Sequence, residues 1–196
     1  MNDMEYKRFD SGRSSILHGT QYLFYEVPFC FSSIDPENKS TAECRYCVAI
    51  ILALTSASSG EELSMIGHIS PEVVTVEKTR QQFCTEYPKV LLNAKHQAKP
   101  GSMAMHLVGG RQGKEHGGDR DFTKEYIEMI KLLGALTEEH LEITLQVKSG
   151  PKTSGVTDVA FGTENRIVVI SEPKPDEHAW EPFDSRSIDT VEQMYS

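Results

Sequence analysis

Two residues of the chain could act together as a nucleophile and a general base, namely Cys47 and His68. A thiol attacks carbonyl carbon as the thiolate, and a free cysteine with a pKa of about 8.5 is mostly protonated at neutral pH. It therefore needs a neighbouring base, commonly a histidine. Cys47 begins an apolar segment directly after a polar loop, and His68 lies near the end of the next apolar segment. This arrangement suggests a thiol–imidazole pair.

The two apolar segments predict a β-hairpin. Residues 46–54 (YCVAIILAL) form a nearly continuous apolar run of strand length, which is typical of a strand buried on both faces. Residues 63–69 (LSMIGHI) predict a second strand, and residues 55–60 (TSASSG) predict the turn between them. A hairpin of this length brings positions 47 and 68 roughly opposite each other.

A third group must hold the imidazole in the correct tautomer, and Thr41 in the preceding loop is the candidate. Activation by His68 would make Cys47 the most readily alkylated of the four cysteines near neutral pH. Spacing alone does not establish catalysis, because any cysteine and histidine on adjacent strands would satisfy it. A buried free cysteine usually acts as a small hydrophobic residue.

Cys44 and Cys47 also form a Cys-x-x-Cys motif, which can hold a metal or perform redox chemistry. A structural zinc site needs four ligands, and the remaining Cys30 and Cys84 are isolated in the sequence. A redox motif of this kind opens a helix, whereas this stretch is rich in strands. We therefore expect no metal and no cofactor. Cys44 is interpreted as a bystander, or as a thiol that traps Cys47 in a disulfide on oxidation.

The elements around the hairpin mix strands with helices. One helix is expected to start at Ser70 and Pro71 and to run toward Cys84, and a clearer one spans residues 119–134 and ends at Gly134. Residues 32–41 predict a loop, and residues 109–118 a glycine-rich one. Further strands are predicted over residues 21–31, 102–108, 140–147, 156–161 and 166–170. The sum is an α+β fold, a mixed β-sheet sandwich with about two main helices.

Composition narrows the class of partner. The length of 196 residues fits one domain, and the net charge of −9 argues against nucleic acid. No basic cluster favours a membrane surface, and the longest apolar run, residues 48–54, is too short to span a bilayer. The polar N-terminus does not resemble a Sec-type signal peptide, and four cysteines in a chain of this size favour reduced thiols. We expect a cytoplasmic protein, or one delivered into another cell without such a signal.

Residues 41–51 (TAECRYCVAII), followed by residues 65–71 (MIGHISP), resemble the core of the chemoreceptor glutamine deamidases, the CheD family. In that family a threonine stands six residues before a cysteine that opens a Cys-Val-Ala strand, and a histidine follows one hairpin later. Residues 106–110 (HLVGG) and 162–169 (GTENRIVV) follow in the family's order. The resemblance spans about residues 41–171. It implies a CheD-like domain over residues 41–172, between an N-terminal extension at 1–40 with a partly packed strand and an acidic tail at 173–196.

The resemblance implies that Cys47 is the nucleophile, His68 the base and Thr41 the residue that orients His68. The implied reaction is hydrolysis of a protein glutamine side chain to glutamate. Cytotoxic necrotizing factor toxins share this fold and dyad, so a role as a toxin or effector is as compatible as one in chemotaxis. Arg45 and Tyr46 stand where the family usually has Gly-Ser.

The expected partner is a protein that presents an exposed glutamine, and the acidic surface favours a partner with a basic patch. The loops at residues 55–61 and 109–118 are the expected walls of the groove around Cys47. Two alternatives remain. The chain could be a catalytically silent docking module on the same fold, or a small-molecule amidase.

Overall fold

The computed structural model of the protein describes residues 5–10, 20–22, 28–42, 44, 46–115, 118–149, 158–164 and 166–172. These residues form two five-stranded sheets and three helices, which confirms the predicted α+β class. Residues 23–27, the middle of the predicted strand at 21–31, lie outside the described part of the chain. The whole predicted acidic tail, residues 173–196, also lies outside it.

The first sheet carries the predicted hairpin at its centre. Its strand order is β3 (Phe29–Phe31), β6 (Glu62–Ile69), β5 (Val48–Thr55), β7 (Ala104–Gly109) and β8 (Gln146–Ser149). All neighbours are antiparallel except β7 and β8, which are parallel. The turn between β5 and β6 falls at residues 56–61, as the sequence predicts.

The second sheet lies against one face of the first. Its strand order is β1 (Glu5–Asp10), β10 (Ile167–Glu172), β9 (Asp158–Gly162), β4 (Lys39–Ala42) and β2 (Thr20–Tyr22). Both sheets draw on the first forty residues, because β1 pairs with β10, β2 with β4, and β3 with β6. The packed structure therefore begins well before residue 41.

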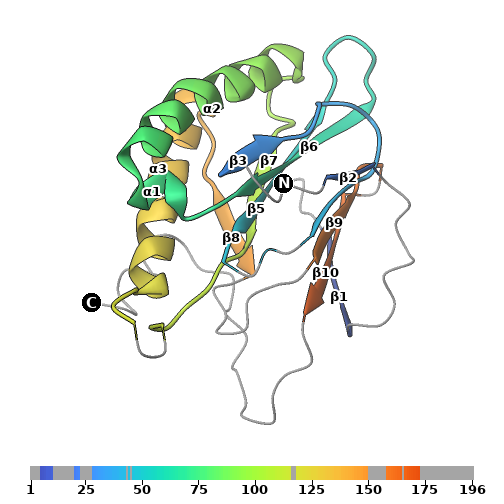
Figure 1. The fold of residues 1–196 in the computed structure, drawn as a ribbon. Coiled ribbons are helices and arrows are strands. Elements are labelled where there is room, and N and C mark those ends of the chain that lie inside the picture. The colour runs from blue at the N-terminus through green and yellow to red at the C-terminus, as the bar shows by residue number, and fades with distance from the viewer. Residues whose placement is uncertain are drawn as a thin grey trace.

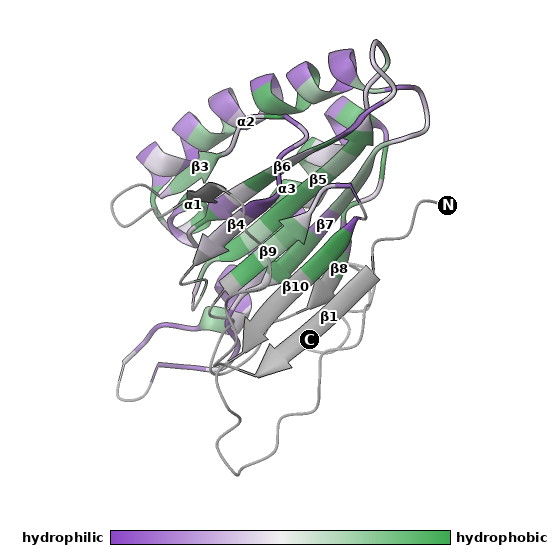
Figure 2. Cartoon of the chain, turned by 90° about the vertical axis from the view of Figure 1, so that its right-hand side faces the viewer, coloured by the Kyte–Doolittle hydropathy of each residue, from purple (hydrophilic) through white to green (hydrophobic). Residues whose placement is uncertain are grey.

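Three helices cover the other face of the first sheet: α1 (Glu72–Thr75), α2 (Glu77–Gln97) and α3 (Phe122–Leu141). Figure 1 shows the resulting three layers, with the helices on one side of β5 and β6 and with β9 and β10 on the other. α2 is largely hydrophilic, while β5, in the middle layer, is hydrophobic (Figure 2). No helix within the described residues is long and apolar enough to cross a membrane.

The apolar run of β5 serves both layers. Val48, Ile50 and the further even-numbered residues belong to the core shared with the helices. Ala49, Ile51 and Ala53 belong to the core between the two sheets. Since successive side chains of a strand point to opposite faces, a strand in the middle layer must be apolar at every position. This explains the continuous run that the sequence shows.

The helices are longer than the sequence predicts. α3 continues past Gly134 to Leu141, so the predicted strand over residues 140–147 is wrong at its start, and β8 begins at Gln146. Leu133, Thr137 and Leu141 keep the buried stripe at a spacing of four residues, and this burial outweighs the helix-weakening effect of one glycine. The helix ends instead at Glu142, whose φ of 59° is left-handed.

Candidate active site

His68 lies on β6 in the middle layer, where it is paired with Ala49 of β5 on one side and Cys30 of β3 on the other. Ala49 belongs to the core between the sheets, so the His68 side chain shares that face. The residue is almost fully buried. The imidazole is therefore held inside the sandwich rather than on its surface.

Thr41 reaches His68 from the opposite sheet. Its hydroxyl lies 2.9 Å from Nδ1 of His68, which is the contact that the sequence predicts between these residues. The sequence predicts that Thr41 lies in a loop, but it lies in β4, where it pairs with Val159 of β9. The loop prediction for residues 32–41 failed here because β4 contains Lys39, a charged residue that is buried through an ion pair with Asp35. The hydrogen bond thus joins the two sheets.

Two further cysteines contact His68, one at its ring and one at its backbone. The buried thiol of Cys44 is 3.8 Å from Nδ1 of His68, and the thiol of Cys30 is 3.8 Å from the backbone carbonyl of His68. Cys30 is isolated in the sequence, but pairing of β3 with β6 places it opposite His68. Cys44 is more than a bystander, since it shares Nδ1 with Thr41. Only the Cys-x-x-Cys spacing pointed to Cys44, and no local sequence signal pointed to Cys30.

Cys47 lies one residue before β5, at the end of the same sheet, and is half-buried. Its carbonyl accepts a hydrogen bond of 3.0 Å from the backbone N–H of Gly110. The last ladder pair joins Val48 to Ile69, so Cys47 stands beside Ser70 and diagonal to His68. The predicted pairing of Cys47 with His68 is therefore wrong by two residues.

Glycines shape the loop that follows β7. Gly109 and Gly110 have φ values of 92° and 97°, in a region that favours glycine. A Cβ atom on Gly110 would lie 2.3 Å from the ring of Tyr126, so no larger residue fits there without displacing α3. These two glycines therefore serve the turn, as the sequence suggests, and they let the loop close on the backbone of Cys47.

Burial raises the pKa of the Cys47 thiol to about 11. The loss of water around the thiolate is the main cause, and Glu72 adds to it by charge repulsion. A hydrogen bond from the Ser70 side chain and the positive charge of Arg120 act in the opposite direction. Neither residue was predicted as a neighbour of the thiol, although Ser70 was expected at the start of a helix. A raised pKa runs against the predicted ready alkylation of Cys47, because the protonated thiol is then the favoured resting form.

This shift predicts a specific pH dependence of alkylation. Below its pKa the thiolate fraction rises about tenfold per pH unit, so the rate of Cys47 labelling by iodoacetamide should climb steadily between about pH 7 and 10. Mass spectrometry of the peptide that contains Cys47, after brief pulses at each pH, measures this rate. A plateau near neutral pH would instead show a thiolate already stabilised by His68.

The remaining hollows and clusters lie elsewhere. A cavity of about 600 Å³ borders the N-terminal half of α3 and is lined by Lys114, Lys124 and Lys131 among others, but not by Cys47 or His68. Across the described ranges, no group of three or more His, Cys, Asp or Glu side chains has a geometry that could hold a metal ion. All four cysteines are free thiols.

Comparison with known proteins leaves the family open. No protein-family model matches the chain, and no curated protein is recognisably similar to it.

The geometry itself limits what the site can do. It combines a half-buried thiol at a sheet end, a buried imidazole on the neighbouring strand and a hydroxyl bound to one nitrogen of that imidazole. Such a set can move a proton away from a nucleophile and return it to a leaving group.

Proposed function

We propose that the protein is a cysteine-dependent hydrolase that deamidates a glutamine side chain of another protein, on a fold related to that of the CheD family. The observation that carries the proposal is the hydrogen bond of 2.9 Å between Thr41 and Nδ1 of His68, made across two sheets. A buried histidine oriented in this way, with a cysteine diagonal to it, fits the base and nucleophile of such an enzyme.

The reaction proceeds in two stages. Cys47 Sγ attacks the carboxamide carbon of the glutamine while its proton passes to His68, and the tetrahedral intermediate then expels ammonia with that proton. Water, deprotonated by His68, attacks the resulting thioester and releases glutamate and the thiol. Since Thr41 and Cys44 both face Nδ1 of His68, we assign the proton exchange to Nε2.

The raised pKa of Cys47 shapes this mechanism. A thiol that is protonated at rest must lose its proton as the substrate binds, so His68 acts as a general base rather than as the partner of a preformed thiolate. The positive charge of Arg120 lowers the pKa of the thiol and so favours this transfer. Binding of a substrate over Cys47 would also exclude water from the proton path.

The same burial favours a second candidate. A catalytically silent docking module has no need of an activated thiol, and a Cys47 pKa of about 11 is what a structural cysteine would show. In that case the Thr41–His68 hydrogen bond would only satisfy a buried polar pair between the sheets.

The decisive experiment compares wild-type protein with Cys47→Ser after incubation with bacterial and eukaryotic lysates. We expect glutamine sites that gain about one dalton, the mass change when an amide is hydrolysed to an acid, with wild type only. Activity should survive EDTA. Cys84→Ser is the matched control, because Cys84 is a half-buried cysteine on α2, away from His68. If no site depends on Cys47 in either lysate, the docking module is the better assignment.

A further inference from the structure

Next to Cys47, two arginines and two aromatic rings form a compact group, which we call the Arg–aromatic cluster: Tyr46, Arg111, Arg120 and Phe122. The rings of Tyr46 and Phe122 have centroids 5.2 Å apart. The guanidinium carbon of Arg111 lies 4.6 Å from the Tyr46 centroid and 4.3 Å from that of Phe122. The Arg120 guanidinium lies 4.9 Å from the Phe122 centroid. Rings hold an arginine in this way without neutralising its charge.

The two arginines differ in their ionic partners. Arg120 is bound by Glu125 through three hydrogen bonds of 2.8 to 3.0 Å, so its charge is already paired. Among the residues that the structure describes, no carboxylate forms an ion pair with Arg111, and its buried Nε has no hydrogen-bond partner there. The two rings hold the Arg111 guanidinium in place and leave it able to bind a carboxylate, since its planar N–H groups match the two carboxylate oxygens.

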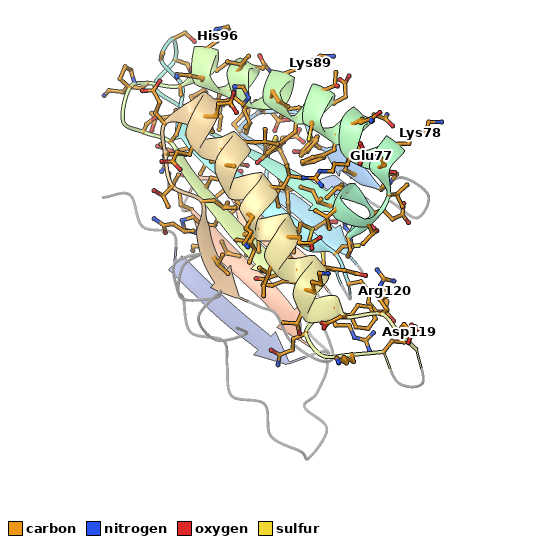
Figure 3. All side chains as sticks on the ribbon, turned by 90° about the vertical axis from the view of Figure 1, so that its left-hand side faces the viewer. Glu77, Lys78, Lys89, His96, Asp119 and Arg120 are labelled. Carbon is orange, nitrogen blue, oxygen red and sulfur yellow. The ribbon has the colours of Figure 1, made fainter. Side chains whose placement is uncertain are left out.

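The position of the cluster ties it to the thiol. Tyr46 directly precedes Cys47 and is 41% exposed. Arg111 directly follows Gly110, whose N–H binds the Cys47 carbonyl. Figure 3 shows Arg120 at the N-terminal end of α3, far along the molecule from Lys89 on the outer side of α2. A chain that lies across Tyr46 with its glutamine at Cys47 would thus bring a neighbouring residue to Arg111.

We propose that Arg111 is a specificity-determining residue that binds the carboxylate of an aspartate or glutamate next to the target glutamine. This inference rests on the proposed function. It concerns the immediate contact at the thiol, whereas the net charge of −9 acts over the whole surface and favours a more distant basic patch. The substrate would then combine an acidic residue beside the glutamine with a basic surface around it.

Binding of synthetic peptides by a Cys47→Ala protein tests the inference without turnover. The probes are fluorescein-labelled Ala-Glu-Gln-Glu-Ala and its amide isostere Ala-Gln-Gln-Gln-Ala, followed by fluorescence anisotropy. We expect the acidic peptide to bind about ten- to a hundredfold more tightly, as a charge-assisted hydrogen bond implies. In the same background Arg111→Gln should abolish this preference and Arg111→Lys should restore part of it. Lys89→Gln removes the same charge from an exposed site and should preserve it.

Tyr46→Leu provides a second variant if Arg111→Gln fails to fold, since Tyr46 is exposed and its loss removes one of the two rings beside Arg111. It should reduce the preference for the acidic peptide. Equal binding of both peptides, no binding of either, or a preference that persists in Arg111→Gln would overturn the inference. Deamidation in lysate without acidic neighbours would refute the inference and leave the proposed function intact. An Arg111-dependent preference with no Cys47-dependent deamidation would support the binding role of Arg111 and refute the proposed function.

Discussion

Replacing His68 with glutamine is expected to slow Cys47-dependent glutamine deamidation by about 10²- to 10⁴-fold, the usual contribution of a positioned general base. The physical reason is the raised pKa of Cys47, about 11, which leaves little thiolate at neutral pH unless a base removes the proton. The rate of the variant should then rise about tenfold per pH unit with the thiolate fraction, whereas the wild-type rate should rise less steeply because a base removes the proton. Rates from pH 6 to 10, on a site found in lysate, measure this.

Histidine 106 offers a matched control for the loss of a buried imidazole. It lies on β7, opposite Ile51, and is as deeply buried as His68. His106→Gln should therefore cost stability but retain the wild-type pH profile of deamidation. A similar loss of rate in His106→Gln and His68→Gln would show that the effect comes from packing and would contradict the assignment of His68 as base.

Thr41 variants separate orientation from chemistry. Thr41→Val keeps the shape but removes the hydroxyl from Nδ1 of His68, and the loss of one buried hydrogen bond should slow the reaction about tenfold. Thr41→Ser retains the hydroxyl and should remain close to wild type. If the two variants react at equal rates, the hydroxyl does not orient the imidazole.

Local pattern was sufficient to predict the hairpin but not its register. The apolar runs of β5 and β6 and the turn between them mark the two strands, yet the ladder places Cys47 beside Ser70, two residues from the predicted pairing with His68. Thr41 was the candidate partner of His68 both from its place before Cys47 and through the family resemblance, but its strand was not predicted, since β4 pairs with β9, which is distant in sequence.

What sequence could not give depends on such distant contacts. Cys30 reaches His68 only because β3 pairs with the edge of β6. A strand of three residues is too short for its hydrophobic pattern to predict that pairing. The raised pKa of Cys47 comes mainly from burial beneath neighbouring elements, which no local pattern in the sequence indicates. Likewise, Arg111 and Arg120 meet at Tyr46 through the fold of the glycine loop and not through any motif.

The relative placement of the two sheets, on which the Thr41–His68 contact depends, is stabilised by Arg166. This residue follows β9 in the second sheet, has a left-handed φ of 51° and is almost fully buried. Its guanidinium donates a hydrogen bond of 2.7 Å to the carboxylate of Glu62 on β6 and one of 3.3 Å to the carbonyl of Ser102. It also donates to the Thr55 hydroxyl at the end of β5. One side chain thus joins the turn of one sheet to the hairpin end of the other.

Arg166→Met is therefore expected to lower the free energy of unfolding by about 2–4 kcal/mol, slightly less than for a fully buried pair because Glu62 is partly exposed. The loss leaves the carboxylate of Glu62 and the carbonyl of Ser102 without their charged donor. Urea denaturation followed by circular dichroism gives the value, with an unchanged slope indicating an unchanged denatured state. Lys95→Met removes an exposed ion pair with Glu142 and should leave the urea midpoint unaltered.

Under native conditions Arg166→Met should also weaken deamidation, since looser sheets no longer hold Thr41 against His68. A variant as stable as wild type would show that apolar packing alone fixes the two sheets.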